Sequence, residues 1–213
     1  MIALSGPPMR GRKGSGRLRG MGKQEECDWG WRIGETMGEL KHAEPAKLFC
    51  GIIAVDEDAV ARARSELEKH IGEIDIESES MPFDFTDYYR EEMGDNLARK
   101  FVSFRELIAP DRIVDVKLLT NDIERSNKSS GDGPARRRMN LDPGYATPAK
   151  VVLATTKDFS HRIYLRDGIY AEVTMNFRKD GFRYFDWTYP DFRSGRYDGF
   201  FKQVRDRTMK RPA

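Results

Sequence analysis

Two residues of opposite charge, Arg162 and Glu172, are the strongest candidates for chemistry in this chain. They lie on either side of an Asp-Gly turn at Asp167-Gly168, and the side chains around the turn alternate between apolar and polar. Such alternation is typical of half-buried strands. If the two strands pair, the guanidinium could bind an anion while the neighbouring carboxylate acts as a base.

The alternation also predicts how these two strands pair. A two-residue turn would set apolar side chains of one strand opposite polar side chains of the next, which makes that register unfavourable. We therefore expect a three-residue loop, Arg166-Asp167-Gly168, with a left-handed glycine. This register pairs Arg162 with Glu172, Tyr164 with Tyr170, Ile163 with Ala171 and Leu165 with Ile169.

A third strand should complete an antiparallel meander after the loop Lys179-Asp180-Gly181. The same form of loop pairs Met175 with Phe185, Asn176 with Tyr184 and Thr174 with Asp186. In the middle strand we expect one face to pack, with the apolar side chains of Ile169, Ala171, Val173, Met175 and Phe177. The opposite face, with Glu172, is either a ligand site or an ordinary face in water, which is common in antiparallel sheets.

A second candidate for anion binding precedes the meander. The residues Asp142-Pro143-Gly144-Tyr145 are typical of a type II turn, and Thr147-Pro148 is typical of a helix start. A helix beginning there would present free N–H groups to an anion, although an ordinary capped helix has the same pattern. Together the two regions give the candidate ligand-binding residues Arg138, Tyr145, Lys150, Lys157, Arg162, Tyr164 and Tyr170.

For proton transfer the candidates are Glu172 and His161. A single histidine at the start of a strand is more often structural than catalytic. Several carboxylates gather around an aromatic segment and could hold Mg²⁺, namely Glu77, Glu79, Asp84 and Asp87. Acids at strand edges and helix caps are much commoner, so we assign no metal ligands, and the sequence identifies no cofactor.

Composition limits the class of protein. The 213 residues are enough for one sizeable domain, and the two cysteines, Cys27 and Cys50, exclude a disulfide framework and a cysteine-rich zinc site. No apolar run approaches the roughly 20 residues that cross a bilayer. From these features we expect a cytoplasmic protein that does not span a membrane.

The charge is concentrated at the N-terminus. Six of the 37 cations and no acid lie among residues 1–24, which leaves 31 cations against all 35 acids in the rest of the chain. We expect residues 1–40 to be a disordered basic tail that contacts nucleic acid weakly, or an extension upstream of a true start at Met37. Its glycines do not have the spacing of a dinucleotide fingerprint, and no phosphate-binding loop occurs elsewhere.

The elements that must position these residues can be read from apolar periodicity. We expect a strand over 46–55, a helix capped by Asp56, strands over 73–80 and 99–104, and a last helix whose packed face includes Phe200 and Val204. Residues 113–119 fit a strand or a helix, a short helix should cover 120–127, and a flexible loop 127–134. These elements predict a single α+β domain over 41–213, with a mixed, largely antiparallel sheet, a C-terminal three-stranded meander and helices mainly on one face.

Six segments together resemble a prokaryotic family catalogued as domain-of-unknown-function family 4416. The resemblance covers about residues 46–204 and rests on Phe83-Asp84-Phe85-Thr86-Asp87-Tyr88-Tyr89, Asn140-Leu141-Asp142-Pro143-Gly144-Tyr145, Leu153-Ala154-Thr155-Thr156-Lys157-Asp158, His161-Arg162-Ile163-Tyr164-Leu165, Gly168-Ile169-Tyr170-Ala171-Glu172 and Trp187-Thr188-Tyr189-Pro190. The family brings no assigned activity and hence no catalytic residues. The basic tail before Met37 departs from it.

The residues therefore favour an enzyme or binding protein for a small anionic molecule, such as a phosphorylated one. Two other classes stay open. An RNA-associated protein would use the basic tail and exposed tyrosines, but the nearly neutral body argues against it. A partner-binding module without catalysis would present Tyr164 and Tyr170 on an open sheet, with no cleft around Arg162.

Overall fold

The computed structural model describes residues 40–128, 136–179 and 181–209. His42–Ala213 forms one compact unit, and the architecture below is that of its described residues. The expectations for the basic tail and for most of the loop 127–134 lie outside the described residues.

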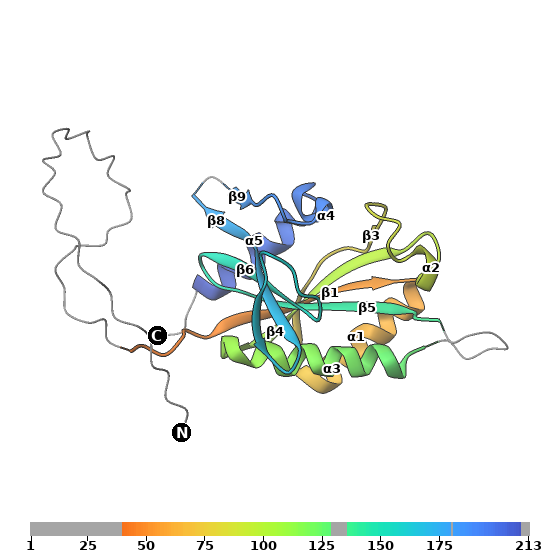
Figure 1. Ribbon diagram of the computed structural model, residues 1–213, viewed down its shortest axis with the longest axis horizontal. Coiled ribbons are helices and arrows are strands. Elements are labelled where there is room, and N and C mark those ends of the chain that lie inside the picture. Colours follow the sequence, from red (N-terminus) through yellow and green to blue (C-terminus); the bar gives the residue numbers. More distant parts are fainter. Residues whose placement is uncertain (1–39, 129–135, 180, 210–213) are drawn as a thin grey trace, which may run out of the picture. The chain divides into compact units, whose positions relative to one another are not determined.

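The first half of the unit is a β-α-β-β-α-β arrangement (Figure 1). Its main elements are β1 (Ala46–Ala54), α1 (Glu57–Ile71), β2 (Ile74–Glu77), β4 (Ala98–Ile108), α3 (Ile113–Ser126) and β5 (Met139–Ala146). The strands lie in the order β2-β4-β1-β5, and each neighbouring pair is antiparallel. This is the split β-α-β topology of ferredoxin-like domains. Between β2 and α3 lie the short elements β3 (Met81–Pro82), α2 (Arg90–Met93) and η1 (Pro110–Arg112).

The second half extends the same sheet beyond β5. It adds β6 (Lys150–Thr155), β7 (Ile163–Arg166), β8 (Ile169–Arg178) and β9 (Gly181–Tyr184), followed by α4 (Pro190–Arg193) and α5 (Asp198–Met209). Strand β8 pairs with β6, β7 and β9, always antiparallel. The predicted α+β class with a largely antiparallel sheet is confirmed. Strands β7 and β9 both pair with the edge of β8 that faces away from β6, so β8 does not lie between them as the middle strand of a meander.

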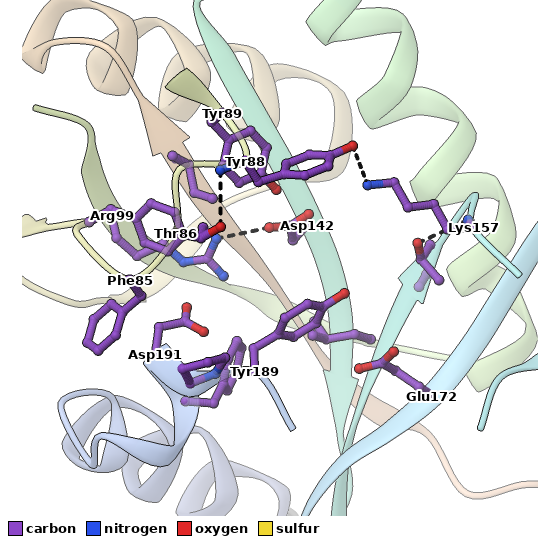
Figure 2. A pocket seen from close by; sticks show the side chains of 17 residues that line it. Phe85, Thr86, Tyr88, Tyr89, Arg99, Asp142, Lys157, Glu172, Tyr189 and Asp191 are labelled. Carbon is purple, nitrogen blue, oxygen red and sulfur yellow. Dashed lines mark hydrogen bonds and ion pairs between the residues drawn. The ribbon is translucent and has the colours of Figure 1, made fainter. Parts of the chain in front are cut away.

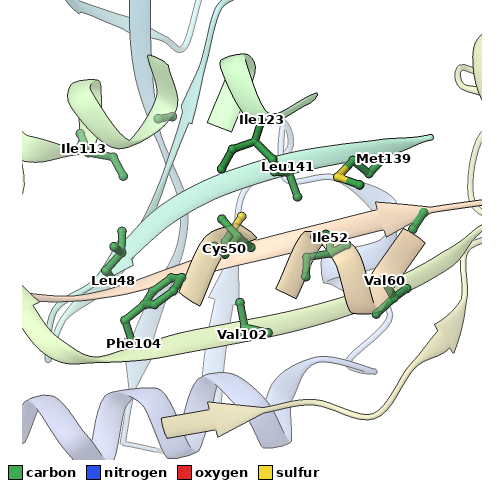
Figure 3. Close-up of a cluster of buried hydrophobic side chains, with 14 of the residues drawn as sticks. Leu48, Cys50, Ile52, Val60, Val102, Phe104, Ile113, Ile123, Met139 and Leu141 are labelled. Atoms are coloured by element: carbon green, nitrogen blue, oxygen red, sulfur yellow. The ribbon is translucent and has the colours of Figure 1, made fainter. Parts of the chain in front are cut away.

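Strand β1 is buried along its whole length because other elements cover both faces of the sheet at this position. Its even-numbered side chains, from Leu48 to Ala54, pack with α1 and α3 in one apolar cluster (Figure 3). On the other face Phe49 packs with Phe101 and with the α5 residues Phe200, Phe201 and Val204. The predicted packing face of the last helix is therefore confirmed.

Local signals explain the helices. The carboxylate of Asp56 accepts a hydrogen bond from the Ala59 N–H at 2.7 Å, so the predicted N-cap of α1 is confirmed. Residues 113–119 and 120–127 were expected as separate elements, but one helix, α3, runs from Ile113 to Ser126. The residues that suggested alternation belong to a helix whose buried side chains recur at helical spacing: Ile113, Val114, Lys117, Thr120 and Ile123.

The turn predicted at Asp142–Tyr145 and the helix predicted at Thr147-Pro148 are wrong. Asp142–Tyr145 lies inside β5, where Pro143 pairs with Cys50 of β1. Strand β6 pairs with β5 only from Gly144 onward, so the ladder on that side stops next to the residue that has no N–H to donate. Thr147 instead closes the β5–β6 turn, since its hydroxyl accepts hydrogen bonds from the N–H groups of Ala149 and Lys150.

The hairpin between β7 and β8 has a two-residue turn instead of the predicted three-residue loop. Asp167 and Gly168 both have positive φ, at 53° and 75°. Such φ values fit a type I′ turn. An irregularity at Leu165 reconciles this turn with the sequence pattern: Ile163–Ala171 and Tyr164–Tyr170 pair as predicted, whereas Arg166, not Leu165, lies opposite Ile169.

The predicted pairing of β8 with the next strand is wrong by one residue. Met175 pairs with Tyr184, and Asn176 with Arg183. The strand β9 ends at Tyr184, so Asp186 does not lie beside Thr174. The hydroxyl of Thr188 donates to the carbonyl of Thr174 at 2.6 Å and thereby ties the following loop to β8.

Candidate functional site

A pocket of about 350 Å³ lies on the sheet face opposite α1 and α3 (Figure 2). Its floor comes from β1, β4, β5, β6 and β8, and its walls come from the segments 83–89 and 189–192. The charged residues and two of the tyrosines in the lining are Tyr88, Arg99, Asp142, Lys157, Glu172, Tyr189 and Asp191.

A bulge in β8 turns Glu172 into this pocket. Val151 pairs with Met175 and Val152 with Val173, so Thr174 is an extra residue between two pairs. The extra residue interrupts the alternation of faces, and Glu172 therefore shares its face with Met175 and Phe177. The expectation of five apolar side chains on one face is wrong for this reason, because Ile169, Ala171 and Val173 face the other way.

Glu172 is almost completely buried, with 3% of the residue exposed. Its Oε2 atom accepts a hydrogen bond from Arg162 Nε at 2.8 Å and lies 3.1 Å from His161 Nε2. The predicted contact between Arg162 and Glu172 is thus confirmed. The other oxygen, Oε1, has no hydrogen-bond partner among the described residues, although it is buried. An unpaired buried carboxylate oxygen is costly, and a ligand that donates a hydrogen bond to it is one explanation for its presence.

The guanidinium of Arg162 makes three hydrogen bonds within the protein. Besides Glu172, it donates to the carbonyl of Lys157 at 3.0 Å and to the hydroxyl of Tyr189 at 2.8 Å. Arg162 does not line the pocket, and its side chain is only 9% exposed. It positions three residues that do line the pocket and does not itself face a ligand there.

His161 is held behind Glu172 by aromatic rings. Its ring stacks on Trp187 at 5.3 Å with an interplanar angle of 11°, and it meets the edge of Phe159, also at 5.3 Å. The indole N–H of Trp187 donates to the carbonyl of Val173 at 3.0 Å. His161 is therefore fixed in its contact with Glu172 but does not itself line the pocket.

Lys157 is an exposed cation at the rim of the pocket. Its ammonium donates to the hydroxyl of Tyr88 at 2.6 Å and lies 4.0 Å from the centre of the same ring. Within the described part of the chain it has no carboxylate partner. Its charge is therefore available to a ligand.

Arg99 and Asp142 form an ion pair in the floor of the pocket. Their closest atoms, Nη1 and Oδ2, are 2.9 Å apart, and only 3% of the Arg99 side chain is exposed. The guanidinium carbon lies 4.5 Å from the ring centre of Phe101 and within 6 Å of two more rings, Phe83 at 5.8 Å and Phe192 at 5.9 Å. Arg99 is thus both an ion-pair partner and a cation packed among aromatic rings.

Near Arg99, the pKa of one carboxylate is lowered and the pKa of another is raised. Burial alone would raise the pKa of Asp142, but the Arg99 and Lys117 cations lower it below its ordinary value of 3.8. Burial dominates for Asp191 and raises its pKa. Burial and the Glu172 charge likewise raise the pKa of Tyr189 to about 12, so this hydroxyl remains a hydrogen-bond donor at neutral pH.

The pair predicts how stability depends on pH. Because the folded state favours ionised Asp142, its contribution is fully present above pH 3.8 and is lost as the pH falls through the lower folded-state pKa. We expect the wild type to exceed Asp142→Asn in free energy of unfolding at neutral pH and to lose that advantage below pH 3.8. Urea unfolding of both proteins across this range is the measurement. An advantage that grows toward acid pH would contradict the assignment.

Besides Arg162, five other predicted ligand-binding residues do not line the pocket. Arg138 pairs with Asp56 at 2.6 Å, at the start of α1. Tyr145 packs against the α1 and α3 cluster, and Lys150 is exposed at the first residue of β6. Tyr164 and Tyr170 form an edge-to-face pair at 5.3 Å, with Tyr164 57% exposed.

Sequence reasoning missed Arg99, Asp142 and the two aromatic wall segments. The sequence contains little signal for Arg99, because this residue is the first of the predicted strand 99–104 and is followed by a second cation, Lys100. Three of the four acids that could hold Mg²⁺ pair with cations instead: Glu77 with Arg64 and Lys100, Asp84 with Arg196, and Asp87 with Arg90. Among residues 40–128, 136–179 and 181–209, no group of three or more His, Cys, Asp or Glu side chains could hold a metal ion.

Comparison with known proteins gives one match. Residues 44–207 match the model of a family described as Domain of unknown function (DUF4416). Searches of curated proteins and of solved structures found no match. Within the described residues, none of the helices has the length and apolar character that crossing a membrane requires.

Proposed function

The chain belongs to the DUF4416 family, whose description assigns no activity, and we propose from the pocket itself that the protein binds a small anionic molecule, such as a phosphorylated one. Lys157 pairs with the anionic group of the ligand, and Glu172 accepts a hydrogen bond from its other end. The observation that carries the proposal is the unpaired Oε1 atom of Glu172, which is buried in the floor of a pocket whose rim has a cation, Lys157, with no carboxylate partner among the described residues.

Charge supports this orientation. The other lining cation, Arg99, already pairs with Asp142, and Arg162 already pairs with Glu172. A ligand anion therefore finds its partner in Lys157. A buried carboxylate repels an anion at the inner end, so the inner end of the ligand must be a hydrogen-bond donor.

The same arrangement suits proton transfer. In an enzyme Glu172 would act as general base through Oε1, while Arg162 and His161 hold Oε2. In a binding protein the carboxylate would only accept the hydrogen bond. We further propose a cytoplasmic location, which the free buried thiol of Cys50 supports.

A lysine variant with a matched control tests the proposal. We expect Lys157→Met to weaken binding of phosphorylated metabolites by about tenfold, since it removes one charge-assisted contact of about 1.4 kcal/mol. Lys150→Met removes an exposed lysine from the same strand region but lies outside the pocket, and its binding should equal that of the wild type. A thermal-shift screen of sugar phosphates, nucleotides and carboxylates supplies the ligand, and calorimetry gives the affinities. Equal losses in both variants would remove Lys157 from the site.

A further inference from the structure

We infer that the ligand of this pocket is a nucleotide whose base carries an exocyclic amino group. The inference rests on the proposed function and names the class of molecule that the two ends and the walls of the pocket suit together. Three independent features support it: the aromatic walls, the acceptor groups at the inner end and the cation at the rim.

The walls between the charged groups are largely aromatic. Six aromatic side chains line the pocket: Phe83, Phe85, Tyr88, Tyr89, Tyr189 and Phe192. In Figure 2 the ring of Tyr189 lies between Asp191 and Glu172 and faces the open space. Flat faces of this kind stack favourably on a planar heterocycle, whose π surface they match. Most of these rings already contact another ring or a cation of the protein. Among the described residues no ring or cation stacks on Tyr189, so a planar base would supply a partner for this ring that a sugar phosphate or a small carboxylic acid lacks.

Two carboxylates of the inner end can accept hydrogen bonds, and Arg99, the cation beside them, is paired with Asp142. Glu172 offers its free Oε1 atom, and Asp142 keeps 28% of its side chain exposed while its pKa is lowered. An amino group on the base supplies the donor that Oε1 lacks. Hypoxanthine and uracil carry a carbonyl oxygen where adenine and cytosine carry the amino group, and hypoxanthine has only a hydrogen atom where guanine carries its amino group. Neither base therefore offers an exocyclic donor to Oε1.

The two ends of the pocket differ in exposure, which fixes the direction of the ligand. Glu172 is 3% exposed, whereas Tyr88, the partner of Lys157, is 59% exposed. The base therefore enters first and the phosphate remains at the rim beside Lys157. The pocket volume of about 350 Å³ lies at the lower end of the range for small-molecule sites, which suits a mononucleotide rather than a dinucleotide.

Calorimetry with the full chain tests the inference. The probes are AMP, GMP and CMP, their counterparts IMP and UMP, which lack the amino group, and ribose 5-phosphate, which lacks the base. We expect at least one amino-bearing nucleotide to bind at least tenfold more tightly than its counterpart and than ribose 5-phosphate. In Glu172→Gln this preference should fall to less than threefold, because the amide also offers a donor.

The outcomes separate the two proposals. If ribose 5-phosphate binds as tightly as the nucleotides, or IMP and UMP as tightly as AMP, GMP and CMP, the inference about the base is overturned while anion binding stands. If none of these phosphorylated compounds binds, the inference fails again, and failure of the full metabolite screen as well would overturn the proposed function. Because the wild-type series alone gives these results, the test holds even if Glu172→Gln does not fold.

Discussion

Replacing Arg99 by methionine should lower the free energy of unfolding by about 3–5 kcal/mol, the usual cost of removing one partner from a buried ion pair. The side chain of Arg99 is 3% exposed and is bound to Asp142 at 2.9 Å. Methionine fits among the three phenylalanine rings but leaves the carboxylate of Asp142 without its cation. Chemical denaturation of the wild type and the variant at neutral pH measures the difference.

A double variant distinguishes charge from packing as the cause. Arg99→Met combined with Asp142→Asn removes both charges, and we expect it to recover most of the loss, since apolar or neutral replacements of whole buried pairs are often nearly neutral. If the double variant is as unstable as Arg99→Met, the contacts of Arg99 with Phe83, Phe101 and Phe192 account for its contribution, and the ion pair does not.

A second large effect is expected at Gly144, where β5 and β6 meet. A Cβ atom there would lie 2.4 Å from the carbonyl oxygen of Val152 and 2.5 Å from the Phe49 ring. One of these neighbours is backbone, so the strands must move apart to accept even alanine. We expect Gly144→Ala to reduce the free energy of unfolding by about 1–3 kcal/mol, as overpacking in cores does.

Gly199 provides the matched control for that substitution. It lies in α5, and a Cβ atom there would have no neighbour within 4 Å. Gly199→Ala should therefore leave stability unchanged or raise it by up to about 1 kcal/mol, because alanine favours a helix more than glycine does. Denaturant titrations of both variants are the measurement, and an equal loss in both would show that space at Gly144 is not the limiting factor.

Much of the fold follows from local patterns. The capped helix α1, the buried strand β1 and the packed face of α5 were predictable because each has a strong apolar period and a clear boundary residue. The contact between Arg162 and Glu172 followed from the alternation around Asp167-Gly168, with the correct pairing of Ile163 with Ala171 and Tyr164 with Tyr170.

The errors arose where tertiary contacts override local chemistry. Pro143 and Gly144 are residues that favour turns, but both lie in β5, where they pair with Cys50 and Phe49 of β1. Strand β6 pairs with β5 only from Gly144 onward, so Pro143 needs no N–H on that side. The two bulges, at Leu165 and Thr174, leave no mark in the sequence, since neither contains glycine. A register that shifts by one residue at such points cannot be read from alternation alone.

The candidate site was predictable only in its C-terminal half. Glu172 and Lys157 lie in the region predicted to form a meander, whose sequence was informative, and His161 and Arg162 contact Glu172 as near neighbours in that region. Arg99 and Asp142 are more than 40 positions apart in the sequence. Their side chains meet across β1, which lies between β4 and β5 in the sheet. No short-range pattern contains that information.

The extra residue in β8 separates the strand into one end that packs in the core and another end that lines the pocket. Toward Phe177 the inward side chains fill the interior beside α5, whereas toward Glu172 the inward position holds a carboxylate against open space. Since the two stretches do not share one alternation, apolar contacts at the far end can change without moving the carboxylate to the opposite side. One face of β8 thereby carries both a carboxylate and apolar core residues, and substitutions among the core residues can occur without changing the position of the carboxylate.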